Sequence, residues 1–257
     1  MKTVPSVKDA LYLYAAVALT FLLLGAATAD MENPRALILA AEWTGLVAFP
    51  LALAWRRGWS IEKTFLLRPA PLLPLAAGVT MAAGVTAAVL LYAAFQNIFF
   101  PMPPEFAETM ARVASFKTPL EAAWVFFILA ATPAFCEEFL CRGLLLSALR
   151  SRLPDSASIW IAALLFAALH FDPWRFVPTL FLGVAFGWLA VRMRSLAPAV
   201  AGHMLNNAVS LAALWWHADS HFERAAQIYM GVAVWCLVLG GVAVKKLTEN
   251  RPGAQQS

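Results

Sequence analysis

The residues that could do chemistry gather in the run A-F-C-E-E-F-L-C-R-G at positions 134–143. It places Glu137, Glu138 and Arg142 inside a segment that is otherwise apolar enough to lie in a bilayer. A charge at the centre of a membrane helix costs about 3 kcal/mol or more, so such charges are typically paired or functional. Glu138 and Arg142 are four apart and share a helix face, so we expect an ion pair between them. Glu137 then points elsewhere and is free to face a cavity.

Two further apolar segments bring polar groups to the same depth. His203 and Asn207 are four apart and form one polar stripe, while His170 closes another segment, with Phe166 one turn earlier. A carboxylate can take a proton from water, and imidazoles can orient that water or hold a metal. Zinc on Glu137, His170 and His203 would keep one position open for water and lower the pKa of that water to about 7. Asn207 could donate to a developing oxyanion, so together these groups indicate hydrolysis of an amide bond.

Structural interpretations stand beside the chemical ones. Glu138 and Arg142 could be a purely structural buried pair, and Asn206 is expected to be structural. Glu42, the only charge in its segment, is more often a packing or lumen-facing carboxylate. Pro133 precedes Glu137 by four residues and interrupts the backbone ladder there, so we expect a kink at the site.

The composition is that of a membrane protein. Hydrophobic residues make up 61% of the 257 residues, charged residues only 13%, and the mean hydropathy is +0.71. A soluble domain would carry about twice that charge. The net charge of +4 comes without a basic soluble domain, so we expect no nucleic-acid partner. Residues 1–257 are predicted to be one integral membrane domain, with the catalytic motifs within 119–216 and a polar C-terminal tail at 245–257.

The predicted fold is all-α: a polytopic bundle of about eight transmembrane helices that encloses an intramembrane polar cavity. The expected spans are Ala10–Ala29, Ala36–Trp55, Leu72–Phe99, Pro119–Leu149, Ser156–Phe171, Arg175–Val191, Leu196–Trp216 and Ala225–Val244. Gly183 and Gly187 form a small-xxx-small pattern that favours close helix packing. Residues 105–117 mix apolar and charged residues at near-helical spacing, which fits either an interfacial helix or a plain connecting helix.

The distribution of Lys and Arg predicts the orientation. Basic residues concentrate at the termini and in the even-numbered loops, for example Arg56, Arg57 and Lys63 in the second loop. The positive-inside rule then places both termini in the cytoplasm. We expect an integral protein of a prokaryotic-type plasma (inner) membrane, in contact with membrane lipids.

Three motifs carry a family resemblance. Residues 137–142 match E-E-x-x-x-R, residues 166–170 match F-x-x-x-H, and residues 203–207 match H-x-x-x-N. In this order on separate membrane helices, they resemble the CAAX prenyl protease and bacteriocin-processing family, also called the Abi group of intramembrane proteases. The resemblance covers roughly residues 119–216. The chain shows no H-E-x-x-H, G-x-S-x-G or G-x-G-D pattern of other membrane or serine hydrolases.

The resemblance implies an endopeptidase that cleaves a membrane-associated peptide or protein, prenylated, bacteriocin-like or unlipidated. Glu137 would be the general base, His170 would share its water or a metal, and His203 and Asn207 would bind the metal or stabilise the oxyanion. Glu138 and Arg142 would complete the site, with Arg142 placed to meet a substrate carboxylate. Zinc, another divalent metal and no metal all remain open. The competing hypotheses are a non-catalytic membrane scaffold or immunity protein of the same fold, and a proton-coupled transporter. The absence of paired half-sequence repeats argues against many transporters.

Overall fold

The structure, a computed structural model, describes residues 5–28, 31–215 and 222–249, and of residues 222–228 it describes the backbone alone. Within these ranges the regular structure is entirely helical, which confirms the predicted all-α class. The elements in chain order are α1 (Val7–Thr28), α2 (Arg35–Ala41), η1 (Glu42–Ala48), α3 (Phe49–Arg57), α4 (Ile61–Thr64), α5 (Leu72–Phe99), α6 (Pro104–Ala114), α7 (Pro119–Phe126), η2 (Phe127–Ala131), α8 (Thr132–Glu138), η3 (Phe139–Leu145), α9 (Leu146–Arg150), α10 (Asp155–Ala168), α11 (Pro173–Met193), α12 (Ala197–Trp215) and α13 (Phe222–Glu249).

Six helical segments of the described chain are long and apolar enough to cross a membrane. They are Val7–Thr28, Arg35–Arg57, Leu72–Phe99, Pro119–Arg150, Pro173–Met193 and Tyr229–Glu249. Their outward faces carry exposed apolar side chains such as Leu23, 60% exposed, and Trp235, 66% exposed. Such surfaces need a lipid environment, so the protein is an integral membrane protein. The shorter α10 and the more polar α12 occupy the two remaining predicted segments, so the predicted count of eight is compatible with the structure and stays a prediction.

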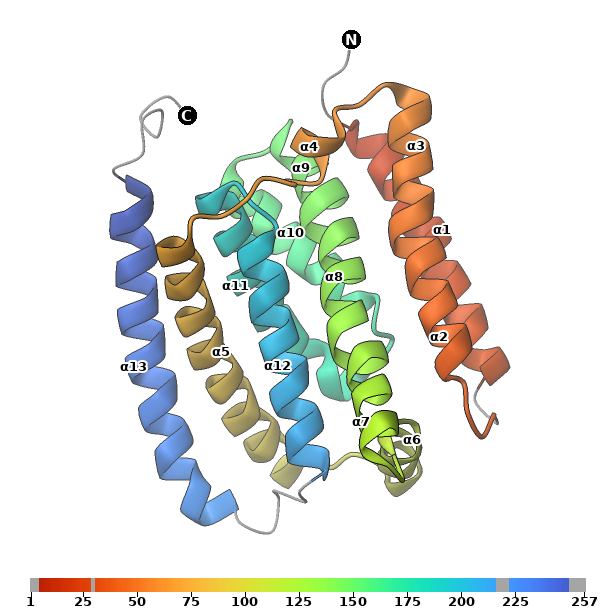
Figure 1. Cartoon of the computed structure of the whole chain (residues 1–257), viewed down its shortest axis with the longest axis vertical. Helices are drawn as coiled ribbons and strands as arrows, with labels where there is room; N and C mark the ends of the chain where they lie inside the picture. Colours follow the sequence, from red (N-terminus) through yellow and green to blue (C-terminus); the bar gives the residue numbers. More distant parts are fainter. Residues whose placement is uncertain (1–4, 29–30, 216–221, 250–257) are drawn as a thin grey trace.

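The helices stand side by side, with the start of α1 and the end of α13 at the same end of the bundle, as Figure 1 shows. The long α5 packs against α11, α12 and α13, and α10 packs against α11. Gly183 and Gly187 lie at a close helix contact, as predicted, and the partner is α10: a Cβ at Gly183 would lie 3.0 Å from Cβ of Ala163, and one at Gly187 would lie 3.2 Å from Cγ2 of Ile159. The helix α13 continues to Glu249, so it includes the first five residues of the predicted tail; residues 250–257 lie outside the described ranges.

The rod formed by residues 119–150 is not a regular α-helix. It runs through α7, η2, α8, η3 and α9, and the two η segments are π-helical. The segment η2 ends two residues before Pro133, and η1 likewise ends two residues before Pro50. Proline has no N–H, and its ring crowds the carbonyl one turn earlier, so the preceding turn widens. The interruption predicted at Pro133 is therefore present, and Glu137 and Glu138 lie between two π-helical segments.

Most of the segment 105–117 lies in the short helix α6 (Pro104–Ala114), at the end of the bundle opposite the start of α1 (Figure 1). Two side chains from neighbouring elements fasten its C-terminal end. Nε of Arg35 donates to the carbonyl of Val113 at 2.8 Å, and Nε1 of Trp215 donates to the carbonyl of Ala114 at 2.8 Å. This helix covers one side of the cavity described next, so it is more than a connector.

Candidate active site

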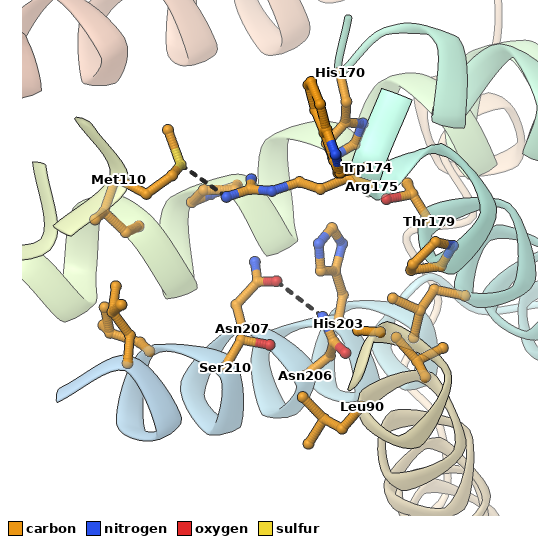
Figure 2. A pocket seen from close by; sticks show the side chains of 18 of the residues that line it. Leu90, Met110, His170, Trp174, Arg175, Thr179, His203, Asn206, Asn207 and Ser210 are labelled. Carbon is orange, nitrogen blue, oxygen red and sulfur yellow. Dashed lines mark hydrogen bonds between the residues drawn. The ribbon is translucent and has the colours of Figure 1, made fainter. Parts of the chain in front are cut away.

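A cavity of about 530 Å³ lies inside the bundle, within the size range of small-molecule and peptide sites. Its wall is built from several elements, among them the 119–150 rod, the end of α10, the start of α11 and the second part of α12. The predicted site residues Glu137, His170, His203 and Asn207 all line it. Figure 2 shows His170 and His203 facing the cavity from opposite sides, from the end of α10 and from α12.

Glu138 lies behind this wall, and one of its carboxylate oxygens contacts both Arg142 and His203. Its Oε1 is 2.9 Å from Nη1 of Arg142 and 2.9 Å from Nδ1 of His203. The predicted ion pair between Glu138 and Arg142 is thus present, and its two side chains are 0% and 1% exposed. The sequence did not indicate that His203 would share the same carboxylate oxygen.

Arg142 has no access to the cavity. Its Nη2 donates to the carbonyl of Gly183 at 3.1 Å, and its guanidinium carbon lies 4.2 Å from the ring centre of Phe166. The side chain is therefore enclosed by the carboxylate, a backbone carbonyl and an aromatic face. The expectation that Arg142 meets a substrate carboxylate is wrong for this arrangement, because the guanidinium is buried and already contacts three internal partners. Arg142 and Glu138 position other groups and do not line the cavity.

The tautomers of both histidines follow from their Nδ1 partners. Nδ1 of His170 is 3.0 Å from the carbonyl oxygen of Phe166, and a carbonyl oxygen can only accept. Nδ1 of His203 faces the paired carboxylate of Glu138, which is also an acceptor. Both Nδ1 atoms therefore carry a proton, so in the neutral form of either ring it is Nε2 that offers a lone pair to the cavity.

The two Nε2 atoms converge on Glu137. Its Oε2 is 3.9 Å from Nε2 of His170 and 3.8 Å from Nε2 of His203. These separations are too long for direct hydrogen bonds. Within the described part of the chain, this Oε2 is also a buried oxygen without a hydrogen-bond partner. Three electron-pair donors around one gap of this width fit a bridging water, whose oxygen could lie within hydrogen-bond distance of all three.

The donor types at this gap are also those that zinc prefers, so we tested the fit of a metal. Ligands of a tetrahedral zinc lie about 3.4 Å from one another, given zinc–ligand bonds of about 2.1 Å. Here the carboxylate oxygen lies 3.8 and 3.9 Å from the two nitrogens. Among residues 5–28, 31–215 and 222–249, no group of three His, Cys, Asp or Glu side chains has the arrangement to hold a metal ion. The observed conformation therefore does not form a complete zinc site.

Asn206 and Asn207 both line the cavity from α12. The amide nitrogen of Asn206 donates to the side-chain oxygen of Asn207 at 3.2 Å. This contact fixes the amide of Asn207 so that its nitrogen points into the cavity, as Figure 2 shows. Asn206 thus supports its neighbour and also borders the cavity.

Two charged residues that line the cavity, Glu42 and Arg175, were not among the predicted site residues. Glu42 lines the cavity from the start of η1, is 5% exposed, and its Oε2 is a buried atom without a partner in the described part of the chain. Of the two interpretations of Glu42, the lumen-facing one is correct. Arg175 lies across the cavity between Trp174 and Met110 (Figure 2), and its Nη2 donates to the thioether sulfur of Met110 at 2.8 Å.

The position of Arg175 follows from a helix cap. Oδ1 of Asp172 accepts hydrogen bonds from the backbone N–H groups of Trp174 and Arg175, at 2.9 and 3.1 Å, and so starts α11. Side chains in a first turn point back past the helix start, here toward the cavity. The D-P-W-R sequence of residues 172–175 could have predicted this position, because Asp is a common N-cap residue and Pro is common in the first turn.

The fold and the cavity together define a polytopic membrane protein whose interior cavity brings a carboxylate, two imidazoles and an amide together. Residues 119–209 match the family model described as Rce1-like, type II CAAX prenyl endopeptidase Rce1-like. This match confirms the resemblance to the CAAX prenyl protease family over the stretch that carries the three motifs, and it supports a peptidase-type hydrolase acting on peptide or protein in a membrane context. Neither the curated proteins nor the solved structures yielded a match to the chain.

Proposed function

We propose that the protein is an intramembrane endopeptidase that hydrolyses a peptide bond of a membrane-associated substrate with water activated by Glu137. The observation that carries the proposal is the convergence of two imidazole Nε2 atoms on Oε2 of Glu137, at distances of 3.8 and 3.9 Å. The gap is of a size and polarity that suit one water molecule. That water would be held by the groups that can remove its proton.

The chemistry follows from the donors and acceptors present. Water donates one proton toward Glu137 and the other toward an imidazole Nε2, so its oxygen lone pair is directed at the carbonyl carbon of the scissile bond. As the new C–O bond forms, the proton passes to Glu137, and the carbonyl oxygen becomes an oxyanion within reach of the Asn207 amide. When the C–N bond breaks, Glu137 returns the proton to the leaving amine. The products are a carboxylate that contains the oxygen of water and a free amine.

Glu138 and Arg142 support this chemistry from behind the wall. The carboxylate of Glu138 fixes His203 with its Nδ1 protonated and its Nε2 toward the cavity. Arg142 neutralises that carboxylate, so the buried charge is compensated. They are positioning residues for the ring of His203.

A metal-assisted version of the reaction remains part of the proposal. Glu137, His170 and His203 would hold zinc after a small inward shift, and the ion would supply Lewis-acid polarisation and a more acidic water. The test is elemental analysis of the purified protein and of the variants His170→Ala and His221→Ala, the second being a matched histidine outside the cavity motifs. Stoichiometric metal that is lost only in His170→Ala supports the zinc version. If the metal content is unchanged in His170→Ala, His170 is not a ligand.

The proposal is tested by cleavage of candidate peptides, lipidated and unlipidated, by the purified protein in liposomes. In water enriched with ¹⁸O, we expect one ¹⁸O atom in the new carboxylate of the N-terminal product and none in the product that carries the new amine. Glu137→Gln is expected to lower turnover by a factor of about 10²–10⁴, because the general base is lost. Glu121→Gln is the matched control, since Glu121 lies on the same rod but is exposed outside the cavity.

The same assay separates the alternatives. Full turnover in Glu137→Gln would contradict the role of Glu137 as base. No cleavage of any peptide by the wild-type protein would favour a scaffold or immunity protein. Proton uptake into liposomes that depends on Glu137 and His170, without cleavage, would favour the transporter.

A further inference from the structure

The position of the cavity along the helices carries information about the substrate. We propose that the cavity opens toward the extracytoplasmic side of the membrane and that the protein acts on a polypeptide segment presented on that side. The inference rests on the proposed endopeptidase function for the nature of the substrate. The side on which the cavity opens rests on geometry and charge alone.

The cavity occupies one end of the bundle. On α5 its wall begins at Val89, past the middle of the helix, and on α12 it begins at His203. On α11 it ends at Phe186, on the 119–150 rod it ends at Glu137, and α10 contributes only Phe166 from its last turn. Each of these limits leaves the cavity in the half of the bundle that contains α6 and the α10–α11 connection. The start of α1 and the end of α13 lie at the other end, called the terminal end below (Figure 1).

The half of the bundle nearer the termini is closed by packing. On the 119–150 rod, the residues that follow the glutamates are fully or almost fully buried, including Phe139 at 2% and Leu140 and Leu144 at 0% exposure. The ring of Phe65, from the connection after α4, stacks on Phe139 with ring centres 3.9 Å apart. On the side of Glu137 that faces the terminal end, the cavity is bounded by the buried ion pair of Glu138 and Arg142. Water and substrate therefore reach Glu137 from the α6 end.

The charges identify which end faces the cytoplasm. Of the 19 Lys and Arg residues in the sequence, thirteen belong to the termini or to the connections at the terminal end of the bundle. Arg142 is buried in the interior. The five at the cavity end are Arg35, Arg112, Lys117, Arg175 and Arg224. Cytoplasmic loops carry the excess of Lys and Arg, so the terminal end is cytoplasmic and the cavity end is extracytoplasmic.

The consequence for the substrate is specific. A peptide bond that remains on the cytoplasmic face would have to cross the packed half of the bundle to meet Glu137. A segment already translocated, or the outer end of a membrane-spanning peptide, reaches it directly. The expected substrate is therefore a secreted or membrane-anchored polypeptide whose scissile bond lies at the outer surface.

The side is tested first without any reference to activity. In a Cys236→Ala background, in which Cys136 and Cys141 are buried, single cysteines are introduced at exposed positions by Glu105→Cys on α6 and by Ser151→Cys after α9. Intact cells are treated with a membrane-impermeant maleimide. We expect Glu105→Cys to be labelled in intact cells and Ser151→Cys only after permeabilisation. The reverse pattern would overturn the inference.

Activity then tests the substrate. Right-side-out and inside-out membrane vesicles are given a charged, membrane-impermeant peptide that the detergent-solubilised protein cleaves. Cleavage by right-side-out vesicles, and by inside-out vesicles only after detergent, supports the inference. Cleavage by sealed inside-out vesicles alone overturns it and leaves the endopeptidase function intact. If no peptide is cleaved in detergent, the proposed function fails, and the labelling still decides the side of the cavity.

Discussion

The substitution Glu138→Gln tests how the buried network supports the site. It removes one negative charge and almost no volume. In the native protein, Oε1 of Glu138 lies 2.9 Å from both Nη1 of Arg142 and Nδ1 of His203. Arg142 would keep its positive charge at 1% exposure, without its counter-ion and without water.

The size of the effect follows from burial. Breaking a fully buried ion pair by removing one partner costs about 3–5 kcal/mol. A glutamine oxygen can still accept the hydrogen bond from Nδ1 of His203, so we expect the lower end, about 3 kcal/mol. The exposed pair of Arg57 and Asp9 has a similar separation, 2.8 Å, but exposures of 55% and 21%. Asp9→Asn should therefore cost less than about 1 kcal/mol.

The assay is thermal unfolding in detergent, followed through the fluorescence of the tryptophans. A loss of 3 kcal/mol corresponds to a decrease in Tm of about 6–12 °C for a chain of this size, against at most about 4 °C for Asp9→Asn. The double variant Glu138→Gln/Arg142→Gln should recover part of the loss, because the unpaired cation is gone. Equal shifts for Glu138→Gln and Asp9→Asn, or no recovery in the double variant, would refute the reasoning from burial.

Three further predictions concern packing, chemistry and the covering helix. Gly240→Ala should lower Tm clearly, because its Cβ would lie 2.7 Å from a backbone Cα of α5, whereas Gly241→Ala, with nothing within 4 Å, should change Tm little; the two are compared by thermal unfolding. Asn207→Ala should lower kcat by a factor of about 10²–10³ with little change in KM if its amide stabilises the oxyanion, and a change confined to KM would contradict that role. Arg35→Ala removes hydrogen bonds to the end of α6, so backbone hydrogen exchange in α6 should become faster; an unchanged exchange rate would mean that Trp215 alone holds the helix.

Helical spacing predicted the main contacts of the site well. It paired Glu138 with Arg142, left Glu137 without a local partner, and brought imidazoles from two other segments to the same depth. Such predictions succeed because charges and imidazoles in a membrane must meet one another or water, which leaves few arrangements.

Other features depended on contacts between distant segments and could not be read from spacing. Arg142 is enclosed by Gly183 and Phe166, residues 41 and 24 positions away, so its isolation from the cavity depends on the packing of three helices. The sharing of Glu138 by His203 depends on the rotation of the rod. Spacing rules assume 3.6 residues per turn, but π-helical turns on both sides of the glutamates change that rotation.

The place of Glu42 beside Glu137 could not be predicted for a related reason. A single carboxylate in an apolar segment gives no sign of which face it occupies, and η1 begins at this residue. Only the packing of η1 against α8 brings it to the cavity that contains Glu137. A lone polar residue in a membrane helix can therefore belong to a cavity even when its own segment gives no sign of one.

The central claim is that Glu137 and the imidazoles serve one common water. The most direct test is kcat/KM for Glu137→Gln, His170→Ala and the double variant, measured on one cleaved peptide. If the residues act as a unit, the double variant should be about as slow as the slower single variant, because the activated water is already lost. Losses that multiply in the double variant would mean that the two side chains act independently, and would contradict the account.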